Sequence, residues 1–250
     1  AWCQQRQLPL QVDQAVPGQV PSEATARQWR YERLAQRARE AGADVVTGHT
    51  ASDRAETMLL QLARGSDLAG LAALPSVRPL SQEGPHLRRP LLHLQRPDTL
   101  QICQDLALPI WDDPSNQSAD FARNRIRQEV LPVLEDLHPG CSLRMSDLAE
   151  RVSQVRDSQT ELSRMALELL QTPAGLDRRG LGALNPATRR LLLAQWLQQQ
   201  GVPPLPAPQL EQLSRRLQQG APGGSADCPG GWQLSWKGAE LMLLQREAGH

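Results

Sequence analysis

The sequence predicts an α/β domain followed by a small helical domain with a terminal β-hairpin. In the first half, helical stretches at residues 22–42 and 50–65 flank a short apolar segment, and this helix–strand–helix order indicates an α/β unit. In the second half, apolar residues recur at helical spacing. A Pro-Gly pair interrupts the pattern between them, so we place the domains at residues 1–139 and 140–250.

The composition is that of a globular protein. Of the 250 residues 40% are hydrophobic, and the 18 glycines bring the apolar share to about 47%, inside the usual range. The 27 basic residues balance the 27 acidic ones, so any nucleic-acid contact depends on local clusters rather than on bulk charge. Six Trp, one Tyr and one Phe are too few for the stacked-base platforms of single-strand RNA-binding sheets.

Four cysteines lie far apart in the sequence: Cys3, Cys103, Cys141 and Cys228. No C-x-x-C pair and no histidine at zinc-finger spacing accompanies them, which argues against a structural zinc, an iron–sulfur cluster and a disulfide framework. No apolar run approaches the roughly 20 residues of a membrane span, and the first residues do not form a signal-peptide pattern. We therefore expect a cytoplasmic protein with no membrane contact.

The first elements have clear sequence signals. Alternating Leu8, Leu10 and Val12 predict a strand with no preceding strand to pair with, so the chain is expected to start partway through a fold. The next helix starts after an N-cap at Ser22 and stops at Gly42. Its five arginines are interpreted mostly as a solvated face: Arg27, Arg30, Arg33, Arg37 and Arg39.

Further elements complete the first domain. The helix over residues 50–65 is expected to bury Ala55, Met58, Leu59 and Leu62. A short strand or turn is expected at residues 88–92 and a helix at residues 97–110. A basic helix is expected to begin at Phe121 and to end before Pro132.

The second domain is predicted to contain three helices and a hairpin. The first helix carries five apolar residues at helical spacing: Leu148, Val152, Val155, Leu162 and Met165. A second helix starts at Asn185-Pro186, and a third follows the Pro-rich linker GVPPLPAP. Around Lys237-Gly238, the segments GWQLSW and ELMLLQ predict the hairpin.

His49, Asp53 and Glu56 form the sharpest local cluster. Spacings of four and three residues put them on one helical face after a strand, at the edge where α/β proteins bind ligands. They could coordinate Mg²⁺, or orient and deprotonate a nucleophile. The pattern also suits an ordinary first helical turn whose acids complement the helix dipole, and spacing alone favours that interpretation.

A second cluster is basic. Arg123 and Arg127 share a helical face suited to phosphate, although such a face is usually just solvated. Residues 112–116 are interpreted as an Asx/Pro turn. The sequence contains no Walker P-loop, no G-x-G-x-x-G and no G-x-S-x-G.

Several short motifs follow one another between residues 22 and 139: ARQWRY, TGHTASDRAET, LARGSDLAGL, RRPLL, DPSN, RNRIR and EVLPVL. This succession resembles the tRNA(Ile)-lysidine synthetases, which are PP-loop ATP pyrophosphatases related to the adenine-nucleotide alpha-hydrolase fold. The resemblance implies an incomplete Rossmann-like PP-loop domain followed by a helical half that contacts tRNA. Arg-rich surfaces for that contact would include six residues, each of which also fits ordinary surface charge: Arg178, Arg179, Arg189, Arg190, Arg215 and Arg216.

The resemblance also implies a reaction. Such enzymes use ATP to adenylate the C2 oxygen of the wobble cytidine in the CAU anticodon of tRNA(Ile). An amine of L-lysine then attacks C2, AMP leaves, and the codon that is read changes from AUG to AUA. ATP, Mg²⁺, tRNA(Ile), L-lysine and a homodimer are the implied cofactors and partners.

The resemblance assigns roles to individual residues. Asp53 would position the lysine amine or accept its proton, and Glu56 would orient that amine or bind Mg²⁺. The other implied site residues are His49 and Gly48 against the nucleotide, and Arg27 and Arg123 against phosphate or the adenylated intermediate.

One part of the family pattern is missing from these residues. The family opens with an S-G-G-x-D-S loop that holds the diphosphate of ATP, and the sequence contains no such loop. We therefore expect the 250 residues alone to be inactive or nearly so. A non-catalytic tRNA- or nucleotide-binding PP-loop remnant is the alternative, while the lack of a C-x-x-C pair disfavours a tRNA-thiolating enzyme. A pure scaffold role has the least support.

Overall fold

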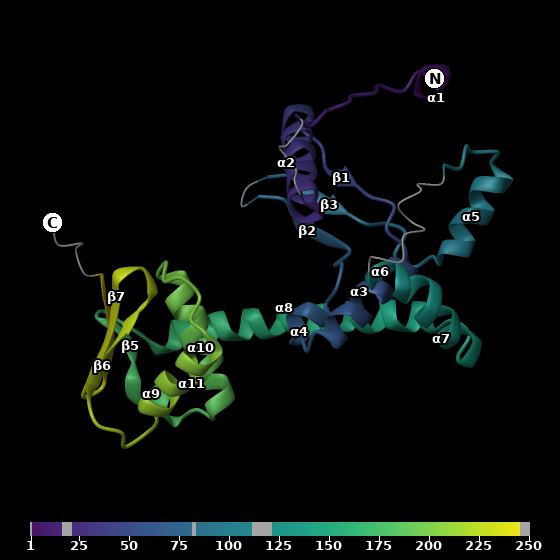
Figure 1. Ribbon diagram of the computed structural model, residues 1–250. Coiled ribbons are helices and arrows are strands. Elements are labelled where there is room, and N and C mark those ends of the chain that lie inside the picture. The colour runs from purple at the N-terminus through teal and green to yellow at the C-terminus, as the bar shows by residue number, and fades with distance from the viewer. Residues whose placement is uncertain (1, 17–21, 82–83, 112–121, 246–250) are drawn as a thin grey trace. The chain divides into compact units, whose positions relative to one another are not determined.

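The computed structural model describes residues 2–16, 22–81, 84–111 and 122–245 (Figure 1). It divides into two compact units, Ala1–Gln154 and Val155–His250, and the division falls inside helix α8 (Cys141–Leu170). The predicted boundary at residues 139–140 directly precedes this helix and stays a prediction. None of the described helices is both long and apolar enough to cross a membrane.

The first unit contains a small sheet and the helices around it. Its elements before α8 are α1 (Trp2–Gln5), α2 (Glu23–Ala41), β1 (Val45–Val46), α3 (Ala51–Ala63), α4 (Leu68–Leu71), β2 (Val77–Pro79), β3 (His86–Arg88), α5 (Arg96–Asp105), α6 (Ala122–Arg125), the π-helix η2 (Ile126–Val130) and α7 (Leu131–Leu137). The strand order is β1–β3–β2, with β3 parallel to β1 and antiparallel to β2. Parallel strands end at the same edge of a sheet, so the residues after β1 and after β3 lie close together.

Helix α2 packs against this sheet through a small apolar core of Ala38, Val45 and Leu87. Ser22 caps its first turn by accepting a hydrogen bond from the Thr25 N–H. Gly42 ends the helix in the left-handed region, at φ 59°, which glycine adopts without steric cost. The α2–β1–α3 succession confirms the predicted α/β unit.

The predicted strand at Leu8, Leu10 and Val12 is wrong. The three residues have no regular secondary structure, and all three side chains are exposed. A strand needs a neighbouring strand to satisfy its backbone, and no strand in the described part of the chain pairs with this segment.

The predicted core face of α3 is partly wrong. Ala55 and Met58 are buried, but Leu62 is 48% exposed. Met58 packs with Ala73 and Ala149 in a small apolar cluster. Leu62 lies one helical turn further along α3 and is not part of that cluster.

The basic helix does not end before Pro132, as the sequence predicted. Helical backbone continues through α6, η2 and α7 to Leu137. Proline lacks an N–H and clashes with the carbonyl four residues back in an α-helix, but a wider turn before it avoids the conflict. The π-helix η2 supplies that turn, and the Leu131 N–H donates to the Ile126 carbonyl, five residues back.

The second unit combines helices with a sheet that the sequence only partly predicted. Its elements after α8 are β4 (Gln171–Thr172), β5 (Gly175–Asp177), α9 (Arg178–Ala183), α10 (Pro186–Gln199), α11 (Ala207–Arg216), β6 (Gly224–Cys228), the short helix η3 (Pro229–Gly231), β7 (Trp232–Lys237) and β8 (Glu240–Gln245). The predicted hairpin is confirmed as β7–β8, with Gly238 in its turn at φ 61°. It belongs to an antiparallel sheet of order β4–β5–β8–β7–β6.

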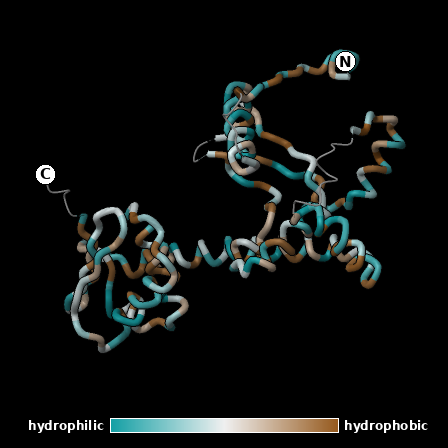
Figure 2. The backbone as a smooth tube through the Cα atoms, viewed as in Figure 1, coloured by the Kyte–Doolittle hydropathy of each residue, from teal (hydrophilic) through white to brown (hydrophobic). Residues whose placement is uncertain are grey.

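Helix α8 is amphipathic, but its buried face is not the predicted one. Hydrophobic and hydrophilic stretches alternate along it (Figure 2). Four of the five residues singled out are exposed, namely Leu148, Val155, Leu162 and Met165. Small residues are buried instead, namely Ser146, Ala149, Ser153 and Ser163. Small side chains let neighbouring backbone approach the helix closely. The prediction considered only large apolar residues and therefore missed this face.

Candidate functional site

The loop from β1 into α3 carries the first functional residues. The Thr50 N–H and hydroxyl both donate to Asp53 Oδ2 at 2.9 Å. The Asp53 N–H lies 3.4 Å from Thr50 Oγ1, which completes a capping box at the start of α3. One carboxylate oxygen of Asp53 therefore starts the helix, and the other is left for different partners.

Glu56 lies one turn further along α3 and is fully buried. Its Oε2 accepts from Arg123 Nε at 2.7 Å, and its Oε1 accepts from Arg127 Nε at 2.7 Å. These arginines come from α6 and η2, far along the chain. A buried carboxylate is tolerated only when it is paired and hydrogen-bonded, and the two guanidinium groups meet that need.

A third arginine comes from the start of α5. Arg96 Nη2 donates to Asp53 Oδ1 at 3.0 Å, and its Nη1 lies 3.6 Å from Glu56 Oε1. Arg123 Nη2 also reaches Asp53 Oδ1, at 3.4 Å. We call these five side chains the carboxylate–arginine cluster: Asp53, Glu56, Arg96, Arg123 and Arg127. Its three positive and two negative charges leave one net positive charge.

Asp53 stays ionised in this environment. Burial acts to raise the pKa of its carboxyl group, but the hydrogen bond from the Thr50 N–H and the charge of Arg96 outweigh burial and lower it. A carboxylate with a lowered pKa is a weak proton acceptor at neutral pH, yet its oxygens can accept a further hydrogen bond from a neutral amine. The side chain is 14% exposed, so a ligand can reach it.

The same arrangement does not fit Mg²⁺ at Asp53 and Glu56. Both Glu56 oxygens and both Asp53 oxygens already accept hydrogen bonds, and three guanidinium groups surround them. Magnesium requires oxygen ligands that are free to coordinate, and a neighbouring positive charge repels it. No group of three or more His, Cys, Asp or Glu in the described segments is arranged to hold a metal ion.

His49 lies between β1 and α3, at the carboxyl edge of the sheet. Its Nδ1 lies 2.9 Å from Thr47 Oγ1. Burial lowers the pKa of the imidazole, and the charges of Arg89, Arg123 and Arg27 lower it further against the opposing charge of Asp53. The ring is therefore neutral at pH 7, with one nitrogen able to donate and the other to accept.

Comparison with known proteins identifies the family. A PP-loop domain model matches residues 1–134, which is more than half of the chain. A tRNA(Ile)-lysidine synthase of Parasynechococcus marenigrum (strain WH8102) is 66% identical over 253 residues, covering 100% of this chain and 75% of that protein. The chain belongs to the tRNA(Ile)-lysidine synthase family. A second such synthase, from a strain of Prochlorococcus marinus, is 38% identical and matches 97% of this chain and 74% of its own length.

The second unit agrees with this assignment. A TilS substrate binding domain model matches residues 176–250. The family that the motif order suggested is thus confirmed. The roles of individual residues are a separate matter and stay predictions.

The structure brings three of the predicted lysidine synthase residues together. Asp53, Glu56 and Arg123 form direct ion pairs. Arg27 contacts none of them and lies against Tyr31, with its guanidinium carbon 5.7 Å from the ring centroid. Gly48 adjoins His49 in the loop after β1, and a Cβ there would meet open space. The turn predicted at residues 112–116 lies outside the described residues.

Sequence reasoning missed Arg96 as a site residue and gave Arg127 no partner. Arg127 had a usable signal, because it lies one helical turn after Arg123 and shares its face. Arg96 had none, since it belongs to none of the recognised motifs and meets Asp53 only through the fold.

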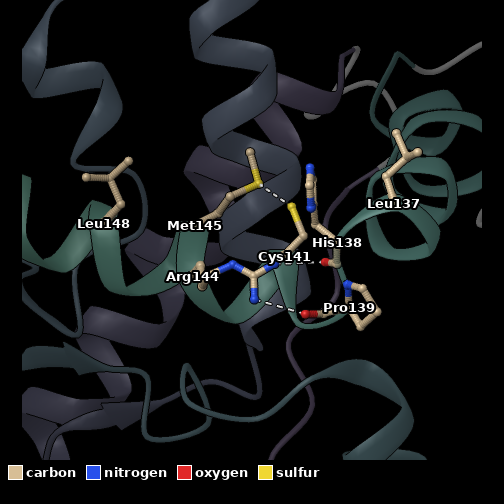
Figure 3. A pocket seen from close by; sticks show the side chains of 7 residues that line it. All are labelled: Leu137, His138, Pro139, Cys141, Arg144, Met145 and Leu148. Carbon is tan, nitrogen blue, oxygen red and sulfur yellow. Dashed lines mark hydrogen bonds between the residues drawn. The ribbon is translucent and has the colours of Figure 1, made fainter.

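A cavity of about 600 Å³ lies elsewhere in the first unit, where α7 meets α8. Figure 3 shows Arg144 donating to the backbone oxygens of His138 and Pro139, and Cys141 in contact with Met145. Burial raises the pKa of the Cys141 thiol, which makes it a poor nucleophile.

Two arginines predicted to contact tRNA are buried. Arg178 is 8% exposed and donates to the carbonyls of Ala221, Pro222 and Gly238, so it holds loops of the second unit together. Arg189 is 5% exposed. Neither presents a basic surface. For these two residues the prediction is wrong, because Arg-Arg pairs suggest an exposed patch, while in α9 and α10 one member of each pair faces inward.

Proposed function

We propose that this protein joins L-lysine to C2 of the wobble cytidine of tRNA(Ile) with a CAU anticodon, using ATP and releasing AMP and diphosphate. The carboxylate–arginine cluster carries the proposal, because it combines a reachable anion for an amine substrate with guanidinium groups for phosphate at the carboxyl edge of a sheet. The names of the curated relatives agree with this activity.

In this proposal Asp53 positions the lysine rather than removing its proton. Its lowered pKa makes it a weak base but a suitable hydrogen-bond acceptor for the neutral lysine amine. Glu56 acts through other residues, because it fixes the Nε atoms of Arg123 and Arg127 at 2.7 Å. The guanidinium groups so held can donate to phosphate oxygens without reorganising during the reaction.

ATP is the proposed co-substrate, in keeping with the PP-loop domain. His49 and Gly48 lie at the edge where its base or ribose would approach, and Arg27 is the proposed contact for its phosphates. Mg²⁺ would be held by the phosphates of ATP, because Asp53 and Glu56 do not fit it. The four cysteines are free, in keeping with the proposed cytoplasmic location, and the homodimer stays a prediction.

The decisive experiment follows the modified nucleoside. The protein encoded by the full open reading frame is incubated with unmodified tRNA(Ile), ATP and L-lysine, and the digested tRNA is analysed by nucleoside mass spectrometry. We expect lysidine and an equal amount of AMP. Asp53→Asn should lose at least tenfold in rate mainly through the lysine KM, whereas Asp98→Asn, a capping residue of α5, should keep the full rate. Binding of tRNA without lysidine or AMP would support the non-catalytic alternative instead.

A further inference from the structure

A second group of arginines surrounds Tyr31 on α2. The Arg78 guanidinium carbon lies 4.8 Å from the ring centroid of Tyr31, and that of Arg27 lies 5.7 Å away. Arg89, the residue after β3, lies close enough to the phenol for its charge to lower the pKa of Tyr31. We call these four side chains the Tyr31 arginine cluster: Arg27, Tyr31, Arg78 and Arg89.

Arg89 is the unusual member because it is buried without a counter-charge. Only 3% of it is exposed, its Nη1 donates to the Pro75 carbonyl at 2.6 Å, and its Nε has no hydrogen-bond partner. Within the described parts of the chain, no carboxylate pairs with Arg27, Arg78 or Arg89. A buried guanidinium that lacks an anion is destabilising, because the charge has lost its hydration without gaining a counter-charge.

The surroundings of Tyr31 reflect this excess of positive charge. Burial acts to raise the pKa of the phenol, but the charges of Arg27, Arg89 and Arg78 outweigh burial and lower it. A more acidic phenol is a stronger hydrogen-bond donor. Arg27 is exposed and Arg78 is half-buried, so an anion can approach from solvent.

The Tyr31 arginine cluster also lies beside the candidate site. Arg89 follows β3, and His49 follows the parallel neighbour β1, so both lie at the same edge of the sheet. Arg89 and Arg27 are close enough to influence the pKa of His49. The two clusters therefore both lie near the loop between β1 and α3, which contains His49.

We propose that Arg78, Arg89 and Tyr31, together with Arg27, bind a phosphate group next to the carboxylate–arginine cluster. Guanidinium forks and a phenol hydroxyl match the geometry and charge of phosphate oxygens, and an anion bound at the exposed Arg27 and half-buried Arg78 would offset the charge of the buried Arg89. The group is either a phosphodiester of the RNA or a phosphate of the nucleotide. That choice of sources rests on the proposed function, whereas anion binding itself does not.

The test measures binding, not catalysis. The full-length protein and the variants Arg78→Gln and Arg89→Gln are titrated with the anticodon stem-loop of tRNA(Ile) and, separately, with ATP. The matched control is Arg88→Gln, because Arg88 adjoins Arg89 but is exposed and pairs with Asp44 at 2.6 Å. Thermal melting checks that each variant is folded, and the half-buried Arg78 provides a variant that does not disturb the interior.

Either source of the phosphate gives a distinct result. Loss of a phosphodiester contact weakens stem-loop binding about tenfold at low salt and lowers the salt slope by about one, with ATP binding unchanged. Loss of a nucleotide contact weakens ATP binding about tenfold and leaves the stem-loop unaffected. If Arg78→Gln and Arg89→Gln both bind both probes as well as Arg88→Gln does, the inference is wrong. A protein that makes no lysidine but loses binding in these variants refutes the proposed function and supports the phosphate subsite.

Discussion

The two clusters at the edge of the small sheet use arginine in opposite ways. In the carboxylate–arginine cluster every carboxylate oxygen has a donor, and the buried Glu56 is matched by two short ion pairs. In the Tyr31 arginine cluster the buried Arg89 donates to a carbonyl, its Nε has no hydrogen-bond partner, and no carboxylate in the described segments pairs with it. In the first cluster the buried charges pair with one another and hold the side chains in place. In the second the positive charge is unpaired, and an anionic ligand would balance it.

Breaking the satisfied cluster should have the largest effect on stability. Glu56→Gln removes the charge that compensates Arg123 and Arg127, so we expect the free energy of unfolding of the first unit to fall by about 3–5 kcal/mol. Urea denaturation followed by circular dichroism measures the change. Glu129→Gln is the control, because Glu129 pairs with Arg125 on the surface and should leave the midpoint unchanged. Equal effects of the two substitutions would contradict the structural role of Glu56.

Two equally buried arginines sharpen the comparison. Arg54 and Arg89 are each 3% exposed, but Arg54 donates to the Leu74 and Ser146 carbonyls and to Glu150 at 3.0 Å. Arg54→Met leaves these acceptors unpaired and should cost about 2–4 kcal/mol. Arg89→Met removes an uncompensated charge and should cost less than about 1 kcal/mol. The same urea titration compares them, and a larger loss for Arg89→Met would show that Arg89 serves stability instead of a ligand.

The sequence predicted the features that depend on neighbouring residues and missed those that depend on long-range packing. Helix ends follow local chemistry, so Ser22 and Gly42 marked the limits of α2 correctly. The spacing of Asp53 and Glu56 on α3 likewise predicted a shared face. Long-range partners depend on the fold, and Arg96 reaches Asp53 only because α5 begins beside α3.

Other failures have the same origin. Leu8, Leu10 and Val12 have the alternation of a strand, but alternation does not supply a neighbouring strand. Pro132 usually ends a helix, but the π-turn before it relieves the clash and cannot be recognised from composition. The burial of Arg89 inside an otherwise basic motif was equally invisible, because burial is a property of packing.

Acid should weaken the first unit partly through Asp53. Its pKa is lowered in the folded protein, so the ionised group contributes stability at pH values above the ordinary pKa of about 4, and the contribution is lost as pH falls through the folded value. Asp53→Asn should therefore flatten the acid limb of a plot of unfolding free energy against pH. The control Asp98→Asn removes the equivalent capping residue of α5, which has no arginine cluster around it. If the acid limb of Asp53→Asn matches that of the unsubstituted protein, the ionised Asp53 contributes no pH-dependent stability through its pairs with the arginines.

The smallest expected effect is a shift of the His49 pKa, and it links the two clusters. Burial dominates the lowered pKa of this imidazole, with Arg89 lowering it further and Asp53 opposing. Arg89→Gln should therefore raise the His49 pKa, and Asp53→Asn should lower it, both measured by NMR titration of the imidazole protons. Arg88→Gln should leave it unchanged, since Arg88 pairs with Asp44. Opposite shifts from the two substitutions mean that one histidine feels both charge clusters, so an anion bound at Arg89 would also raise its pKa. If neither substitution changes the His49 pKa, the imidazole does not sense the charges of Arg89 and Asp53. An anion bound at the Tyr31 arginine cluster would then leave the His49 pKa unchanged.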